Sequence, residues 1–151
     1  MNWEAIGAIG EIAGALAVVV TLIYVSLQLR ENTKSLKVQS LNETFSERSK
    51  MMSELQSHAI GGIYRKIGMD EKLTDEEELK ASWFYTRVCI INEKLHYLHS
   101  IGAADDYNYQ SFGRQLPDMV RNKFFEDWWS KARSQFSKEF QTHIEAIRDD
   151  A

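Results

Sequence analysis

The chain has 151 residues and a formal net charge of −4 at pH 7, with 18 Lys and Arg against 22 Asp and Glu. This weakly acidic balance argues against a nucleic-acid-binding protein, because such proteins gain affinity from clustered basic side chains that face phosphates. Cys89 is the one cysteine, so the chain forms no internal disulfide and has no need of an oxidising compartment.

The first element in chain order is an uncharged stretch of 18 residues from Ile12 to Leu29. As a helix it would extend for about 27 Å, and with the residues from Ala5 onward it exceeds the roughly 30 Å hydrocarbon core of a bilayer. We therefore predict a transmembrane helix in residues 1–30. Two alternatives are a cleaved signal peptide, which would need a basic leader, and a buried core helix, which is seldom apolar all round at this length.

Charges on either side of this stretch predict its orientation. Arg30, Lys34 and Lys37 follow it, whereas Glu4 and Glu11 precede it. Basic residues are enriched in the cytoplasmic flanks of membrane spans. We expect the N-terminus to lie outside and residues 31–151 to lie in the cytoplasm.

Small and polar residues recur along the predicted span at intervals of seven and three residues. The set that we expect to form an interface between copies of the chain is Gly7, Gly10, Gly14, Ala17, Thr21 and Gln28. Small residues allow helix backbones to approach closely in a membrane, and a repeat of seven implies left-handed packing. A chain with one span has no second span of its own, so the simplest partner is another copy. The leading functional hypothesis is a membrane-anchored, homo-oligomeric structural or scaffolding protein.

Glu11 lies beside the glycines, roughly one to two turns into the apolar region that begins at Ala5. Carboxylates are costly at membrane depth and usually face water or a protein interior. Glu11 could lie at the level of the outer headgroups, or a ring of Glu11 side chains could surround the axis of an oligomer. The second possibility makes an oligomeric ion channel or pore the alternative function.

Residues 31–58 are predicted to continue the span as one helix into the cytoplasm, because no helix breaker interrupts them. Its expected buried stripe consists of Val38, Leu41, Phe45, Met52 and Leu55. The run Ala59–Gly62 contains two glycines and predicts a break, with a short helix over Ile63–Ile67 after it. Residues 59–151 are expected to form a compact cytoplasmic bundle of four to five helices.

A long helix is predicted from Asp75 to about Ser100. One apolar line at helical spacing is Phe84, Val88, Ile91, Leu95 and Leu98. A second line of Trp83, Ile90 and Tyr97 predicts that most sides of this helix are buried.

Capping residues mark three helix starts. Thr74 and Glu77 form a capping-box pattern before the long helix. Asp105 or Asp106 can cap the following helix, and Ser137 can cap the last one. These positions fix where the helices of the cytoplasmic part begin.

The C-terminal third is rich in apolar and aromatic side chains at helical spacing. The residues concerned are Tyr109, Phe112, Leu116, Met119, Phe124, Phe125, Trp128, Trp129, Ala132, Phe136, Phe140, Ile144 and Ile147. Pro117 either kinks one helix or begins another in its first turn. The aromatic stripe could bind a partner or a membrane surface, but we expect it to form the core that a small domain needs.

Residues suited to catalysis or metal binding are few. Glu93 and His96 form a Glu-x-x-His pattern with His99 three residues later, but the second copy that di-metal bundles require is missing. A metal protein or enzyme that uses these residues is a third possibility. Cys89 lies among apolar residues and is expected to be an inert thiol. We expect no metal, no cofactor and no catalytic residues.

The opening WEAIGAIGEIAGALAVVVTLIYVSLQLREN and the closing FFEDWWSKARSQFSKEF resemble a family of short, uncharacterised bacterial membrane proteins with one span and a cytoplasmic helical domain. The resemblance implies a bacterial origin and this architecture. We expect the span to lie in the bacterial inner (cytoplasmic) membrane. The family has no established activity, so the resemblance transfers no functional residues to this chain.

Overall fold

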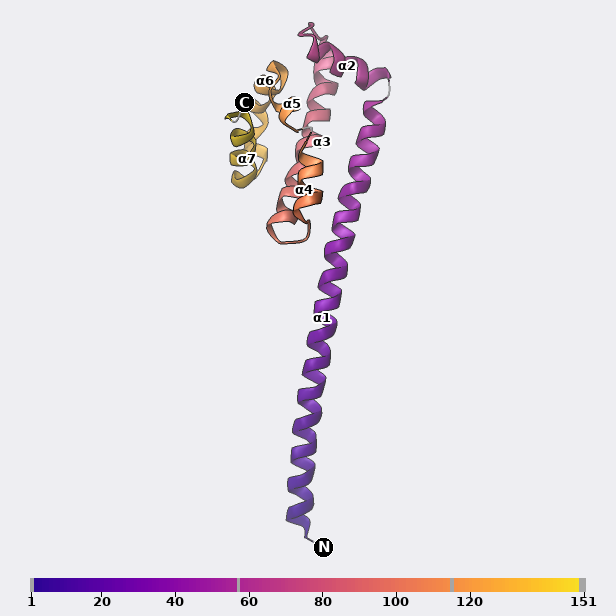
Figure 1. The fold of residues 1–151 in the computed structure, drawn as a ribbon, viewed down its shortest axis with the longest axis vertical. Helices are drawn as coiled ribbons and strands as arrows, with labels where there is room; N and C mark the ends of the chain where they lie inside the picture. Colours follow the sequence, from indigo (N-terminus) through magenta and orange to yellow (C-terminus); the bar gives the residue numbers. More distant parts are fainter. Residues whose placement is uncertain (1, 57, 115, 150–151) are drawn as a thin grey trace. The chain divides into compact units, whose positions relative to one another are not determined.

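A computed structural model describes residues 2–56, 58–114 and 116–149, and within these ranges the chain contains helices and no strands (Figure 1). The predicted all-α class is confirmed. The helices are α1 (Trp3–Leu55), α2 (His58–Gly68), α3 (Asp75–Ser100), α4 (Asp106–Gly113), α5 (Leu116–Val120), α6 (Lys123–Ala132), the 3₁₀ helix η1 (Arg133–Gln135) and α7 (Lys138–Asp149).

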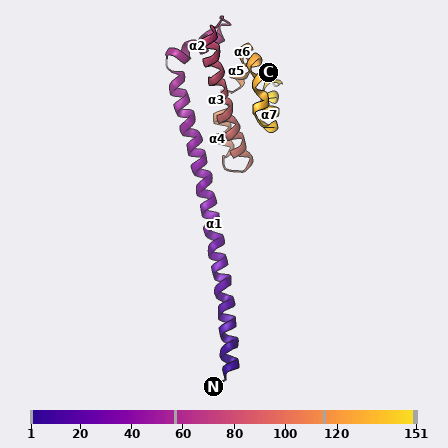
Figure 2. The same cartoon turned by 180° about the vertical axis from the view of Figure 1, so that it is seen from behind.

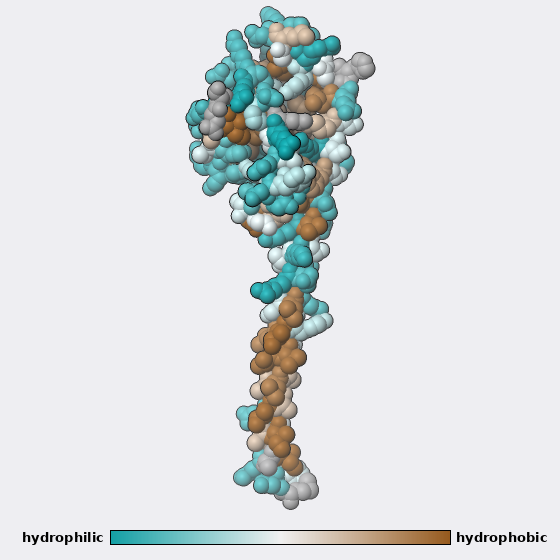
Figure 3. Space-filling view, viewed as in Figure 1, coloured by the Kyte–Doolittle hydropathy of each residue, from teal (hydrophilic) through white to brown (hydrophobic). Residues whose placement is uncertain are grey.

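The chain divides into two compact units, Met1–Gln39 and Ser40–Ala151, with the boundary inside α1. The first unit consists of the N-terminal part of α1. Its described side chains are exposed, apart from a partly exposed Lys37. Figure 3 shows an apolar band along α1 in this unit.

The second unit contains the last segment of α1, residues 40–55, together with α2 to α7. This segment lies alongside α3 in two opposite views (Figures 1 and 2). Two ion pairs join them: Arg87 of α3 with Glu54, and Lys94 of α3 with Glu47 at 3.6 Å. The α3 helix also packs against α2, α4 and α6, so it is the central helix of the unit.

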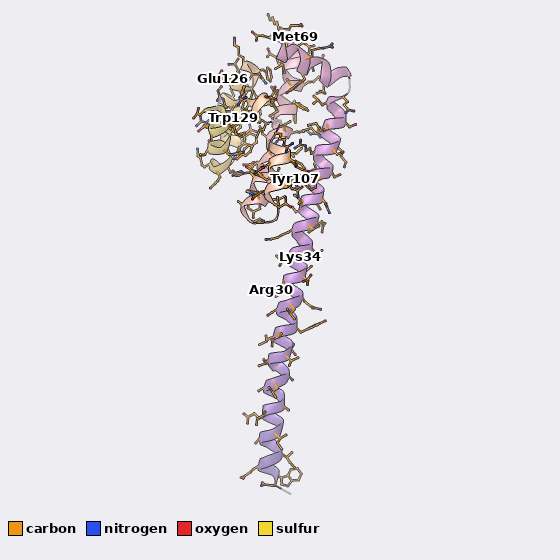
Figure 4. All side chains as sticks on the ribbon, viewed as in Figure 1. Arg30, Lys34, Met69, Tyr107, Glu126 and Trp129 are labelled. Atoms are coloured by element: carbon orange, nitrogen blue, oxygen red, sulfur yellow. The ribbon has the colours of Figure 1, made fainter. Side chains whose placement is uncertain are left out.

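Side chains from α1, α3, α5, α6 and α7, together with Phe136 between η1 and α7, fill the main core. Its buried members are Met51, Phe84, Tyr85, Val88, Cys89, Ile91, Leu116, Met119, Val120, Phe125, Trp128, Trp129, Ala132, Phe136, Phe140 and Ile144. Trp129 is labelled in Figure 4. The aromatic stripe is therefore core, as predicted, and burial of such large side chains is the main source of stability in a small domain.

The predicted caps are confirmed. Thr74 Oγ1 accepts a hydrogen bond from Glu77 N–H, and the Glu77 carboxylate accepts one from Thr74 N–H at 2.9 Å. Asp105, rather than Asp106, caps α4 by accepting from the backbone N–H of Asn108 at 2.7 Å. The Ser137 hydroxyl accepts from the first turn of α7. These short polar side chains satisfy backbone N–H groups that the helix cannot satisfy itself.

The break predicted over Ala59–Gly62 is wrong. The α2 helix runs without interruption through Gly61 and Gly62, so it also starts earlier than the predicted Ile63–Ile67 helix. A Cβ atom added at Gly61 would lie 2.7 Å from the carbonyl oxygen of Leu55, whereas one at Gly62 would meet nothing within 4 Å. Gly61 therefore permits a close approach of α2 to the end of α1, and it does not break a helix.

Two predictions of burial are also wrong. Trp83, Ile90 and Tyr97 are exposed on α3, because the core covers only the other faces of that helix. Val38 is exposed in the first unit, while the other expected members of its stripe pack against the core of the second unit. The fully buried positions on this part of α1 are instead Thr44 and Met51.

Pro117 lies in the first turn of α5, so it begins a new helix. The second unit consequently has six α-helices after α1 in the described ranges, more than the four to five expected.

Candidate functional site

The N-terminal part of α1 has the length and composition to cross a membrane. One helix of the described residues meets both criteria, and none of its most apolar 18-residue window is buried. Arg30 and Lys34 lie on α1 just after the apolar band (Figures 3 and 4). In water, a helix with this much exposed apolar surface would associate with other apolar surfaces. The first unit therefore carries a surface suited to lipid or to other helices.

The predicted interface residues share one side of α1 because the helix is continuous over them. We call the set Gly7, Gly10, Gly14, Ala17, Thr21 and Gln28 the small-residue face. A Cβ atom added at any of its three glycines would meet nothing within 4 Å. The chain's own packing therefore gives no reason for glycine at these positions.

The polar members of the small-residue face have partners within α1. Thr21 Oγ1 donates a hydrogen bond to the carbonyl oxygen of Ala17 at 2.8 Å. Gln28 Nε2 donates to the hydroxyl oxygen of Tyr24 at 2.7 Å. These bonds reduce the penalty of placing a hydroxyl or an amide in lipid.

Glu11 lies beside the small-residue face rather than at its centre. It follows Gly7 by four residues and precedes Gly14 by three, so its side chain flanks the line of glycines. In an oligomer that packs through this face, Glu11 would lie at the edge of each contact.

A pocket of about 260 Å³ lies within the second unit, between the end of α1, α3 and the α4–α5 region. Its walls are mostly apolar and include Met51, Phe84 and Met119. Arg48 lies at this pocket, donates a hydrogen bond to the carbonyl oxygen of Phe112 at 2.8 Å and stacks over its ring at 4.3 Å. Burial lowers the pKa of Arg48. Sequence reasoning missed this pocket, because its walls come from segments that are distant in the chain.

Glu93, His96 and His99, the residues that could have bound a metal, each contact a different residue. The Glu93 carboxylate accepts a hydrogen bond from the backbone N–H of Ser137 at 2.6 Å. His96 Nδ1 is 2.8 Å from the hydroxyl of Tyr109, and His99 Nε2 is 2.8 Å from the carboxylate of Asp106. Over the part of the chain that the structure describes, no three His, Cys, Asp or Glu side chains are placed to hold a metal ion.

A cluster of aromatic rings joins α3, α4 and α7 instead. The Tyr109 hydroxyl also lies 3.2 Å from His143 Nε2, and the rings of His96 and His143 stack with their centroids 4.7 Å apart. Burial lowers the pKa of His96, with a further lowering by nearby His99, while Glu139 and Glu93 oppose it. Burial and His96 lower the pKa of His143. The cluster therefore favours neutral histidines that hold three helices together.

Cys89 is fully buried on α3. Burial, with a smaller contribution from Glu93, raises the pKa of its thiol far above the usual range. A thiol in this state is a poor nucleophile.

Comparison with known proteins found no relative: no family model, no curated protein and no solved structure matches the chain. The resemblance to a bacterial single-span family stays a prediction.

Proposed function

We propose that the protein is a membrane-anchored structural or scaffolding protein that assembles with copies of itself through the small-residue face of one transmembrane helix. In this proposal the span lies in a bacterial inner membrane, with the N-terminus outside. The helical domain is then held in the cytoplasm, as Arg30, Lys34 and Lys37 favour.

One observation carries the proposal. Three glycines are aligned on a helix face, and a methyl group added at any of them would have no other part of the described chain within 4 Å. Glycine lowers helix propensity by about 1 kcal/mol relative to alanine in water but is common in membrane spans, so what needs a reason is the alignment of the three glycines on one face. Close approach of a neighbouring helix supplies that reason.

A bulky residue on the small-residue face should weaken assembly. We expect Gly14→Leu to lower the mass of the detergent-solubilised particle, because the leucine side chain would keep the helix backbones apart. Ala15→Leu is the matched control, since it adds a leucine at the next residue, on a side of α1 turned away from the glycines. An unchanged particle mass in Gly14→Leu would contradict the small-residue face as the interface.

The pore alternative rests on Glu11, which flanks this face. A conducting oligomer would give a current in a reconstituted bilayer that Glu11→Gln alters, because the carboxylate would set the charge of the pore. If neither protein conducts above the lipid background, the pore alternative is contradicted.

A further inference from the structure

The pocket of about 260 Å³ in the second unit is large for a domain of this size. Close-packed protein interiors seldom leave a void much larger than a water molecule, and the loss of stability grows with the volume of the cavity. A concave, mostly apolar pocket with a few polar groups is the usual form of a small-molecule site. The pocket is therefore a candidate binding site, and the proposed scaffolding function does not account for it.

The buried part of the pocket wall is apolar. It includes Met51, Val88 and Met119, and the partly buried Met52 lies beside them. Methionine side chains are unbranched and flexible, so they adjust to the shape of an apolar ligand. This wall suits a hydrocarbon chain.

The polar side chains that line the pocket are more accessible than its apolar ones. Arg48, Tyr64 and Asn92 are partly buried, and Asp118 is exposed. These four residues therefore lie toward the solvent side of the pocket. A molecule with an apolar body and one polar end matches this arrangement.

Two of these polar residues carry opposite charges, and their surroundings decide which one suits the polar end of a ligand. Asp118 is exposed, so water and salt screen its charge. Arg48 is partly buried, and its guanidinium lies over the ring of Phe112, 4.3 Å from the ring centroid. A charge that is partly removed from water interacts more strongly with an opposite charge. The pocket is therefore better suited to an anionic end than to a cationic one.

A hydrogen bond holds Arg48 in this position. Its Nη1 donates to the carbonyl oxygen of Phe112 at 2.8 Å, which fixes the guanidinium at the pocket. An arginine has several N–H groups in a planar fork that matches the two oxygens of a carboxylate. Its charge also attracts a nearby anion whichever of these groups bind within the protein.

The volume of the pocket limits the length of the ligand. A cavity of about 150 Å³ accommodates benzene, so by proportion a pocket of about 260 Å³ accommodates roughly ten non-hydrogen atoms. A straight-chain carboxylate of about eight carbon atoms has this size.

We propose that this pocket binds a free, straight-chain carboxylic acid of medium length, with its chain against the methionines and its ionised carboxylate against Arg48. The inference goes beyond the proposed function and does not depend on self-association. All the residues that line the pocket belong to the second unit of one chain.

The test is isothermal titration calorimetry of octanoate with the full-length protein in lipid nanodiscs free of detergent, since detergent chains would compete. The titration is done at about pH 7.5, where carboxylates are ionised. Empty nanodiscs give the heat of partition into lipid, which is subtracted. We expect saturable binding of one octanoate per chain. The absence of saturable heat would overturn the proposal.

Three analogues test the two ends of the ligand on the wild-type protein. Octylammonium reverses the charge, 1-octanol removes it, and butanoate keeps the carboxylate but shortens the chain. Each should bind at least about tenfold more weakly than octanoate. Equal binding of 1-octanol or butanoate would overturn the role of the charge or of the chain, respectively. Tighter binding of octylammonium would assign the polar end to Asp118 instead of Arg48.

Substitutions of arginine test the anchor. Arg48→Gln should weaken octanoate binding by about tenfold or more, because it removes the charge, and Arg48→Lys should recover part of that loss. Arg87→Gln is the matched control, because Arg87 is exposed on α3, pairs with Glu54 and does not line the pocket. It should bind octanoate as the wild type does. Near-ultraviolet circular dichroism shows whether each variant is folded, and equal binding by wild type and a folded Arg48→Gln would overturn the proposal.

Asp118→Asn tests the opposite charge at the pocket. Because this variant removes a negative charge that repels an anion, it should bind octanoate as tightly as the wild type or more tightly. Weaker binding of octanoate by Asp118→Asn would contradict an anionic ligand held by Arg48.

Discussion

Gly61 and Gly62 offer a matched pair of substitutions with opposite expected effects on stability. Both glycines lie inside α2 and neither has a positive φ, so alanine fits the backbone at each position. In a helix, alanine is favoured over glycine by about 1 kcal/mol. At Gly62 a Cβ atom would meet nothing within 4 Å, so Gly62→Ala should stabilise the second unit by about that amount.

At Gly61 the new methyl group would lie 2.7 Å from the carbonyl oxygen of Leu55, and ordinary contacts begin at 3.4 Å. The backbone at the end of α1 would have to move by 0.7 Å, the difference of these two distances. Forcing extra carbon atoms into a packed site costs about 1–3 kcal/mol. The helix preference of alanine is the same at both positions and cancels in the comparison, so Gly61→Ala should be about 1–3 kcal/mol less stable than Gly62→Ala.

The assay is thermal unfolding of both variants in the same mild detergent, followed by near-ultraviolet circular dichroism of the buried tryptophans. For a domain of this size 1 kcal/mol corresponds to about 4 °C, so the two unfolding temperatures should differ by roughly 4–12 °C. If Gly61→Ala unfolds at the same temperature as Gly62→Ala or above it, the close approach between α2 and Leu55 is wrong.

Two other predictions concern the helical domain. His96 and His143 have lowered pKa values, so the unfolded chain binds protons first as the pH falls. The stability that these two histidines contribute should be fully present above about pH 6.5 and be lost as the pH falls through their folded-state pKa values. The midpoint of urea unfolding, measured between about pH 7.5 and about pH 5, checks this expectation. His143→Phe should make the urea midpoint less dependent on pH. An equally steep dependence in this variant would contradict the role given to His143. Thr74→Ala should lower the free energy of unfolding by about 1 kcal/mol through loss of the capping box. Thr142→Ala, at an exposed position of α7, should change it by less than about 0.5 kcal/mol in the same urea titration.

Local sequence patterns were sufficient to predict much of the fold. The capping box at Thr74 involves residues three apart, so the sequence displays it directly. Trp128 and Trp129 belong to a stripe too apolar to be left in water in a small domain, and both are buried. The repeat of seven residues from Gly7 to Gln28 could also be found from the sequence, because a continuous helix places such residues on one side.

Features that depend on distant segments could not be predicted. Two consecutive glycines usually indicate a break, and only the position of the Leu55 carbonyl shows that Gly61 is needed inside a helix. The apolar line through Trp83 gives no information about what covers it, so burial within one copy was the wrong inference. The contact of Tyr109 with His143 joins residues 34 apart in the chain, and no local sequence pattern predicts it.

The stoichiometry of the intact particle extracted from membranes tests the central claim most directly. We predict more than one chain per particle for the wild-type protein and for Ala15→Leu, and fewer chains per particle for Gly14→Leu. A full-length protein that disperses in water as single chains without detergent would contradict both the membrane anchor and the self-association.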